Sequence, residues 1–471
     1  MRRRRSGRSW LHDAGGFRKR RQLPLSFNFP CVNFPTMSEP APELSEASEF
    51  PFPRHAVIVG AGAVGLMSAI HALDQGLQVT ILDFNEAGSE EASSYGNAGW
   101  LSSHSVIPPV EPGMWKKVPG YLLDPLGPLS IRWRYLPALA PWLLRNLAGA
   151  RHGRIRATAG ALRTLAVDAR LLHQEVAQRA GAGHLIDTSG VLHVYRSRRH
   201  FENDAFGWGL RRELGIQWTE LEGEALRQRE PDLDPAFGFA VHVDEAGHCR
   251  NPGAYMKALE AYACARGARR VQGRATGFRI EDGRLKAVLT GPDEIACDAA
   301  VISAGARSKQ LAALAGDRVR LESERGYHAS IAGHAQQASA RTPMMVSEFK
   351  IIATQMEGGL RIAGQVEFAS FEAAPDWRRG AIMRDLALKL FPALPRALPA
   401  ADVKFWLGRR PSTPDGMPCI GYARASRDIV HAYGHGHIGL GCSARTGRIA
   451  AQLLAGQEPE IDLAPFSPQR F

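Results

Sequence analysis

The strongest constraint on the fold is a glycine-rich turn that separates two apolar segments near residue 60. Residues 56–59 form an apolar run, and the sequence GAGAVG at residues 60–65 follows it directly. A helical pattern then runs through Leu66, Ile70 and Leu73, and Asp83 closes a second apolar run at residues 79–82. This succession predicts a strand–helix–strand unit with the fingerprint of a dinucleotide-binding site.

The residues of this fingerprint have separate physical roles. Gly60 permits the tight turn, Gly62 lets the backbone approach a pyrophosphate, and Gly65 lets the helix pack closely on the sheet. The phosphates would meet unpaired N–H groups at the positive end of the helix dipole. Asp83 follows Gly65 by 18 residues, where a carboxylate accepts hydrogen bonds from ribose hydroxyls and repels the 2′-phosphate of NADP. The unit alone does not choose between NAD and FAD.

Length and charge describe a folded body that carries a basic arm. A chain of 471 residues predicts two interleaved domains, because single cores stop growing below that size. The formal net charge is +11, but residues 1–36 hold nine Lys or Arg against Asp13 alone, which leaves about +3 for the other 435 residues. Basicity is therefore a property of the arm and not of the body.

The basic arm has three interpretations: a nucleic-acid-binding tail, a targeting segment, or translated upstream sequence. It lacks the apolar core of a secretory signal, and its arginines fit a transit peptide only loosely. Met37 begins a polar, acidic segment that leads into the first strand. We therefore predict that Met37 is the working start and that residues 1–54 are disordered.

Downstream segments predict further strands and a second glycine turn. Apolar or alternating runs predict strands at residues 191–195, 237–243, 269–280, 285–289, 327–331, 350–354, 360–364 and 403–407. Amphipathic spacing predicts a helix over residues 155–180, and Asn251 opens another helix. The apolar run at 299–302 enters a turn at Gly305, more than two hundred residues after the first turn. Two such distant turns favour FAD, whose site is often built from separated segments.

Residues 108–150 have two interpretations. Trp133, Leu139 and Trp142 recur at helical spacing with arginines between them. Such a segment fits either the core of a substrate domain or a surface that contacts a membrane, and we favour the core.

Five runs of the sequence are similar to motifs of one known family: VIVGAGAVGLMSA, SSYGNAGWLS, ERGYHASI, GRRPSTPDGMPCIG and GHGHIGLGCSARTGRIAAQLL. On these runs the chain resembles the D-amino-acid oxidase superfamily, and most closely its FAD-dependent D-amino acid dehydrogenases. The first run is generic to dinucleotide folds, whereas the Asn-Ala-Gly loop and the Arg-Pro-x-Thr-Pro-Asp-Gly run are far more specific.

The resemblance implies an α/β fold in which an FAD-binding Rossmann-like domain is interleaved with a mainly antiparallel β-sheet substrate domain. We assign residues 55–105, 240–315 and 408–460 to the FAD-binding domain. Residues 106–239 and 316–407 form the expected substrate domain.

The resemblance also implies which residues bind FAD. The ADP half would be bound by Gly60, Gly62, Gly65 and Asp83. The pyrophosphate and the ring would be lined by Ser93, Ser94, Asn97, Ala98 and Gly99. Gly305 would make the middle contact, and the pyrimidine end would lie beside Gly434, His435, Gly436 and Gly439. No cysteine lies in a flavin-linking motif, so we expect non-covalent FAD.

Candidate substrate residues follow from the same motifs. Arg410, directly before Pro411, matches the position that would bind the substrate carboxylate, because a guanidinium forms bidentate bonds with a carboxylate. The structural alternative is that Arg410 pairs with Asp415 or Asp402, and its neighbour Arg409 is expected to face solvent.

Three further residues are candidates for substrate binding, and each of them could instead have a purely structural role. Tyr327 would donate its hydroxyl to the same carboxylate or pack in the core. His328 and His104 would bind a polar substrate group or accept the amine proton, or else serve the structure. No carboxylate or lysine stands out as the base.

Two other constellations carry less chemistry. His431, His435 and His437 lie within seven residues, but their glycine neighbours and the lack of a nearby carboxylate predict no metal site. The six cysteines show no CxxC spacing, which predicts buried thiols in a reducing compartment.

The expected reaction is oxidative deamination of D-amino acids, or of cyclic D-imino acids, to 2-oxo acids. In the family, a hydride passes from the substrate Cα to flavin N5 and the imino acid is then hydrolysed. The resemblance implies a quinone-type electron acceptor. The alternatives are a glycine- or sarcosine-type oxidase that uses oxygen, and a flavoprotein that acts on nucleic acid through the basic arm. We predict no nucleic-acid partner for the body, and a cytoplasmic protein, free or peripheral to the inner face of the plasma membrane.

Overall fold

The structure, a computed structural model, describes residues 54–108 and 127–471. The expectations for the basic arm and for Met37 lie outside the described residues.

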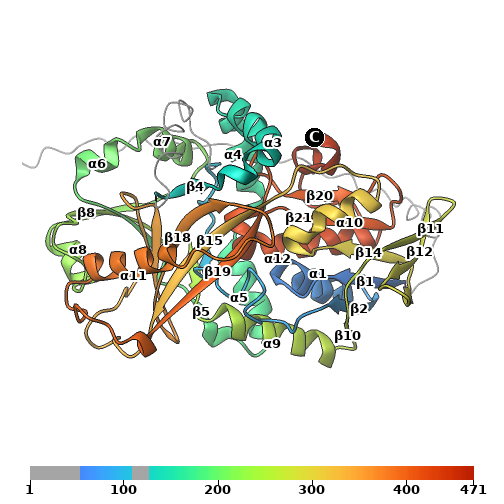
Figure 1. Cartoon of the computed structure of the whole chain (residues 1–471), viewed down its shortest axis with the longest axis horizontal. Helices are drawn as coiled ribbons and strands as arrows, with labels where there is room; N and C mark the ends of the chain where they lie inside the picture. Colours follow the sequence, from blue (N-terminus) through green and yellow to red (C-terminus); the bar gives the residue numbers. More distant parts are fainter. Residues whose placement is uncertain (1–53, 109–126) are drawn as a thin grey trace, which may run out of the picture. The chain divides into compact units, whose positions relative to one another are not determined.

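The first sheet is six-stranded and carries the predicted glycine turns (Figure 1). Its strands, in spatial order, are β10 (Arg269–Gln272), β2 (Gln78–Asp83), β1 (His55–Val59), β14 (Ala299–Ile302), β21 (Ile429–Tyr433) and β20 (Cys419–Tyr422). Neighbouring strands are parallel except for the antiparallel pair β20–β21. The predicted strand–helix–strand unit is confirmed, with α1 (Ala63–Asp74) between β1 and β2.

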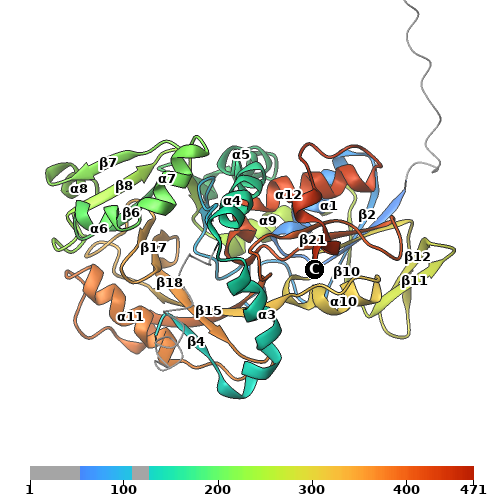
Figure 2. The ribbon, with the colours of Figure 1, turned by 90° about the horizontal axis from the view of Figure 1, so that it is seen from above.

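Helices cover one face of this sheet. Figures 1 and 2 show α1 and α12 (Gly439–Leu454) side by side against it, and α9 (Pro252–Ala265) packs on α1. The two long helices approach closely because Gly447 has no side chain: a Cβ there would lie 2.5 Å from the backbone carbon of Met67. Asn251 caps α9 by accepting a hydrogen bond from the Ala254 N–H, as its sequence signature predicts.

The other face of the first sheet packs on α10 and a small antiparallel sheet, through apolar side chains that include Val57, Ile302 and Leu311. These elements are α10 (Ser308–Leu314), β11 (Gly277–Glu281), β12 (Arg284–Leu289) and β13 (Glu294–Ala296).

The second large sheet is nine-stranded and mainly antiparallel. Its path is β19 (Val403–Ser412), β15 (Glu322–Ile331), β18 (Gly359–Phe368), β17 (Ile351–Met356), β16 (Met344–Val346), β6 (Val191–Tyr195), β8 (Phe239–Val243) and β7 (Thr219–Glu222), and β4 (Leu129–Ile131) pairs with β18. One face buries its apolar side chains against α11 (Arg378–Leu390) and α8 (Glu224–Arg229). The opposite face is the floor of the cavity described below.

The remaining elements lie between the two sheets or beside them. They are α3 (Leu136–Ala148), α4 (His152–Ala166), α5 (Ala169–Arg179), α6 (Arg198–Glu202), α7 (Ala205–Glu213) and a small sheet of β3 (Trp100–Leu101), β9 (Gly247–Cys249) and β5 (Ile186–Asp187).

Two of the predicted helices and strands need correction, and one helix was missed. The single helix expected over residues 155–180 is two helices, because Asp168 adopts a left-handed backbone with φ of 60° between α4 and α5. The strand expected over 269–280 is also two: β10 joins the parallel sheet, and β11 starts an antiparallel hairpin. Helix α11 was not expected at all.

The segment with two interpretations is described from residue 127 to residue 150, and this part shows both kinds of surface. Leu139 and Trp142 are buried against Ile131 and Phe368, as a core segment requires. Trp133 and Leu144 are exposed by 62% and 69%. Among the described residues, no helix combines the length and the apolarity needed to cross a bilayer.

The domain boundaries stay a prediction. By sheet membership, β8 at residues 239–243 and residues 408–412 of β19 belong to the second sheet.

Candidate active site

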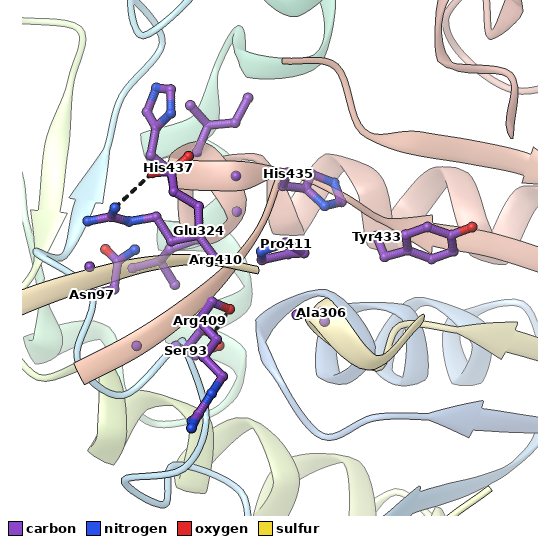
Figure 3. Close-up of a pocket in the computed structure, with 18 of the residues that line it drawn as sticks. Ser93, Asn97, Ala306, Glu324, Arg409, Arg410, Pro411, Tyr433, His435 and His437 are labelled. Carbon is purple, nitrogen blue, oxygen red and sulfur yellow. Dashed lines mark hydrogen bonds and ion pairs between the residues drawn. The ribbon is translucent and has the colours of Figure 1, made fainter. Parts of the chain in front are cut away.

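A cavity of about 1590 Å³ separates the first sheet from the floor of the second (Figure 3). On one side it is lined by the loops that follow β1, β2, β10, β14 and β21, which all leave the carboxyl edge of the parallel strands. That edge is where open α/β sheets bind ligands. Pockets for drug-sized ligands occupy roughly 300–1,000 Å³, so this cavity has room for a dinucleotide and a small substrate together.

The two glycine turns meet at the start of α1. Gly60 has a φ of +115°, and a Cβ on it would lie 2.5 Å from the Ser303 carbonyl oxygen; a Cβ on Gly65 would lie 1.8 Å from the Gly60 carbonyl oxygen. The predicted residues Gly60, Gly62, Gly65 and Gly305 are thus brought together, and only residues without a side chain fit at Gly60 and Gly65.

Asp83 lies at the same turn and lines the cavity. Its Oδ2 accepts a hydrogen bond of 2.6 Å from the Ala61 N–H, and its Oδ1 accepts one from the Asn85 N–H. Ser94 accepts a bond from the Ala63 N–H in the first turn of α1. These polar groups and glycines form a cradle whose chemistry fits the ribose and pyrophosphate of a dinucleotide.

The loop at residues 93–99 runs along the cavity between the sheets. Ser93 donates to the Arg409 carbonyl at 2.6 Å, and Asn97 accepts from the Gly99 N–H at 2.7 Å. Arg361 of β18 donates to the carbonyl of Asn97. Of the predicted loop residues, Ser93, Ser94, Asn97 and Ala98 line the cavity, whereas Gly99 (φ +81°) lies behind it with its carbonyl bonded to Cys249 N–H.

The turn between β21 and α12 closes the far end. Gly434 and Gly436 have φ values of +91° and +52°, and His435, Gly436 and Gly439 line the cavity. His435 is buried with its Nε2 2.9 Å from the Thr446 hydroxyl, and burial lowers its pKa to about 3, so the ring is neutral. The Tyr433 hydroxyl is buried without a hydrogen-bond partner among the described residues, and Figure 3 shows that it points away from the other labelled side chains of the site.

Arg410 lies on the floor and faces the cavity. Its Nη1 is 2.8 Å from Glu324 Oε1, directly across the β15–β19 register, and this ion pair is drawn in Figure 3. The alternatives weighed from the sequence are wrong, because Asp415 pairs with Arg470 and Asp402 with His334.

Arg409 does not face solvent as expected. It is half-buried, its Nε donates to the Phe371 carbonyl at 3.1 Å, and its guanidinium lies 4.8 Å from the centre of the Phe371 ring.

Tyr327 contributes to the cavity wall, but its hydroxyl is engaged elsewhere. The hydroxyl donates to Glu367 Oε2 at 2.7 Å and accepts from the Asp376 N–H, and burial is the main cause that raises its pKa to about 12. Residues 325 and 327 alternate with 324 and 326 along β15, so the structure does not bring this hydroxyl to Arg410.

The two candidate histidines are buried and neutral. His328 stacks on Trp406 at 5.0 Å and bonds the Gly96 carbonyl through Nδ1, and burial lowers its pKa to about 3. His104 Nε2 lies 2.9 Å from His193 Nε2, and burial holds the pKa of both rings well below the usual range. Neither His328 nor His104 lines the cavity; His193 does.

The three neighbouring histidines of the C-terminal motif have separate surroundings. His431 pairs with buried Asp317 at 2.9 Å, His435 bonds Thr446, and His437 lines the cavity. Enclosure by the protein lowers the pKa of His437, although its ring is accessible from the cavity. Within residues 54–108 and 127–471 there is no group of three side chains placed to hold a metal.

Sequence reasoning missed several residues of the site. Trp100, His193 and Trp208 form an aromatic wall, and Glu324 and Ser412 flank Arg410. The only available signal was proximity in sequence, since Glu324 precedes the Arg-Gly-Tyr-His run and Ser412 lies inside the Arg-Pro-Ser-Thr-Pro run.

Comparison with known proteins gives consistent results. The model of the family "DAO: FAD dependent oxidoreductase" matches residues 55–453. A D-amino-acid oxidase of Bradyrhizobium diazoefficiens is 57% identical over 419 residues, which cover 89% of this chain and 99% of that protein. A D-amino acid dehydrogenase of Paramagnetospirillum magneticum is 30% identical, with 88% and 98% covered.

Solved structures agree on the fold. Glycine oxidase from Geobacillus kaustophilus superimposes with a TM-score of 0.66 at 21% identity, over 89% of this chain and 99% of that one. L-proline dehydrogenase from P. horikoshii gives 0.66 at 17% identity, over 90% and 98%. These confirm the expected fold class.

Proposed function

Because the chain belongs to the DAO family of FAD-dependent oxidoreductases, we propose that it oxidises free D-amino acids to 2-oxo acids and ammonia. The observation that carries the proposal is an arginine on the cavity floor opposite a dinucleotide cradle. Arg410 offers a guanidinium to an α-carboxylate on the floor of the cavity in which FAD would bind. The names of the relatives at 57% and 30% identity support D-amino acids as the substrate class.

FAD would lie along the carboxyl edge of the first sheet. The turns at Gly60, Gly62 and Gly305 with Asp83 would hold its ADP half, the loop at 93–99 its middle, and the start of α12 its ring. When bound, FAD accepts the hydride that leaves the substrate Cα. Non-covalent binding is supported by the buried thiols of Cys419 and Cys442, whose pKa values burial raises to about 11 and about 12 and which do not line the cavity.

The chain's own residues would orient the substrate and exclude water. Arg410 fixes the carboxylate, and the wall of Trp100, His193 and Trp208 covers the side-chain end of the cavity. We assign Tyr327 and His328 to support of β15 and of the loop at 93–99, since their polar atoms are bonded to Glu367 and to the Gly96 carbonyl. His104 holds His193 at the wall.

Two electron acceptors have support. The similarity to a D-amino-acid oxidase over nearly the full length of both chains supports oxygen, and we propose oxygen first. A quinone-type acceptor is supported by the dehydrogenases at 30% identity and below. The exposed Trp133 and Leu144 would then offer a peripheral membrane contact.

The test is spectroscopic. We expect the purified protein to show flavin absorption that bleaches under anaerobic conditions with D-amino acids, apolar ones first because the wall is aromatic, and not with their L-enantiomers. Admission of air separates the acceptors, since an oxidase regains colour and forms hydrogen peroxide, whereas a dehydrogenase stays bleached until a dye or quinone analogue is added. A flavin that no amino acid bleaches would contradict the proposal.

A further inference from the structure

A partly buried ion pair stands where the substrate would bind. Arg410 and Glu324 lie 2.8 Å apart on the cavity face of neighbouring strands, with side chains only 25% and 11% exposed. Both line the cavity, and Figure 3 shows the two side chains next to each other beside Asn97 and His437. The pair is therefore partly buried, and the two opposite charges stabilise each other.

Each member of the pair is also held by a second group. Glu324 Oε2 accepts a hydrogen bond of 2.9 Å from the Ser412 hydroxyl, and Arg410 Nη1 donates to the Gln365 carbonyl at 3.2 Å. Gln365 has a φ of 63° at an irregularity of the β15–β18 ladder, and this backbone turns its carbonyl toward Arg410. The two charges can therefore move apart without either losing all of its partners.

Two glycines beside the pair make room for larger side chains on the cavity floor. Gly326 lies under the guanidinium, and a Cβ there would lie 2.2 Å from Arg410 Nη2. Gly408, opposite Gly326 in the register, also carries no side chain. A Cβ on Gly408 would lie 2.1 Å from the Trp406 ring. The two glycines therefore let the Arg410 guanidinium and the Trp406 ring lie against the strands.

A free amino acid carries one positive and one negative group on the same carbon. We propose that Glu324 binds the substrate ammonium group while Arg410 binds the carboxylate, so that the pair recognises the amino-acid zwitterion as a unit. The inference rests on the proposed function and adds a specificity residue to it. When the zwitterion binds, its carboxylate replaces Glu324 as the partner of Arg410, and its ammonium group replaces Arg410 as the partner of Glu324. Each charge on the cavity floor therefore keeps a partner of opposite sign. A plain carboxylate brings a partner for Arg410 only, and it displaces Glu324 into an unpaired state.

The experiment compares a substrate with its deaminated analogue on the FAD-loaded protein. D-Alanine is followed by KM, and propionate, which is alanine without its amino group, by the Kd from its perturbation of the flavin spectrum. In Glu324→Gln we expect the KM for D-alanine to rise about tenfold or more, since a charge-assisted hydrogen bond is lost. The Kd for propionate is expected to fall, because Arg410 is released from its competitor. Arg410→Ala, in contrast, should weaken both ligands.

Two variants complete the design. Glu322→Gln removes a neighbouring glutamate on the same strand that pairs with Lys309 and does not line the cavity, and we expect both constants to stay as in the wild type. Glu324→Asp keeps the negative charge, and its KM for D-alanine should be close to that of the wild type. This variant also tests the inference if Glu324→Gln folds poorly.

Opposite shifts for the two ligands support the inference, and parallel shifts overturn it. If the wild-type flavin is bleached by other D-amino acids but not by D-alanine, the fastest substrate and its deaminated acid replace the pair. Bleaching by no amino acid would overturn the proposed function and this inference together, whereas bleaching with parallel shifts would overturn the inference alone.

Discussion

At the scale of single residues, strand register decides which side chains reach the cavity: Glu324 and Arg410 lie on its floor, whereas the Tyr327 hydroxyl bonds to Glu367. Gly60 and Gly65 were identifiable because both belong to one contiguous glycine motif, although the side-chain space at Gly60 is closed by the distant Ser303 carbonyl. Glu324 begins the ERGYHASI run, but its role could not be predicted, because its pairing with Arg410 depends on the register of two strands that are about ninety residues apart. The same register sends the Tyr327 hydroxyl to the opposite face.

The structure makes a prediction for Tyr327. In Tyr327→Phe, Glu367 and the Asp376 N–H lose a hydrogen-bond partner in a buried setting, so we expect the free energy of unfolding to fall by about 1–3 kcal/mol. Chemical denaturation of the FAD-loaded protein measures this. If the free energy of unfolding is unchanged but the KM for D-amino acids rises strongly, the Tyr327 hydroxyl binds the substrate, as the sequence motif suggested.

At the scale of elements, helices and strands with contiguous sequence signals were predicted correctly, whereas the points at which one element ends and the next begins were not. The β1–α1–β2 unit and the capped start of α9 are as expected, because their signals are adjacent in sequence. The break between α4 and α5 has no glycine or proline to announce it, since Asp168 itself adopts the left-handed conformation. Strand β10 was misassigned because the arginine-rich edge of a parallel sheet lacks an apolar run.

Helix contact between α1 and α12 gives a prediction at this scale. Gly447→Ala places a methyl group 2.5–2.7 Å from backbone atoms of Met67 and Ser68, and we expect a loss of about 1–3 kcal/mol in the free energy of unfolding. The matched control is Gly160→Ala within α4, where no atom lies within 4 Å of the added Cβ. That variant should gain up to ~1 kcal/mol from helix propensity. If Gly447→Ala and Gly160→Ala changed the free energy of unfolding equally, α1 and α12 could move apart without loss of stability.

At the scale of the whole molecule, the fold class and the cofactor followed from motifs that are spread over the chain, and the comparisons confirm both. The second sheet was foreseen as mainly antiparallel, which the strand pairing confirms. Its neighbour relations across residues 191–412 could not be foreseen, because strand order is set by contacts that no local pattern encodes.

Buried histidines make stability depend on pH. Burial lowers the pKa values of His173 and His248 to about 4 and those of His328 and His435 to about 3, and it holds those of His104 and His193 well below their usual range. Between pH 6.5 and about 4 the unfolded chain binds protons that the folded chain does not, so stability falls as pH falls. Each ring contributes on the order of 1.4 kcal/mol per pH unit in this window.

The carboxyl group of Glu230 changes the pH dependence of stability in the opposite direction. Burial raises the pKa of Glu230 to about 7, so its contribution is lost as pH rises, and it offsets about one histidine. We therefore expect urea denaturation of the FAD-loaded protein to give a clearly lower free energy of unfolding at pH 5.5 than at pH 7.5. Equal values at the two pH settings would contradict the neutral state of the histidine rings.

The cavity between the sheets has a consequence beyond catalysis. The cavity of about 1590 Å³ is lined by segments of both large sheets, so bound flavin would contact both sheets and stabilise their association. Ligands that bind only the native state protect it in proportion to their occupancy. The vitamin supply of the cell would then set the lifetime of this protein against proteases as well as its catalytic capacity.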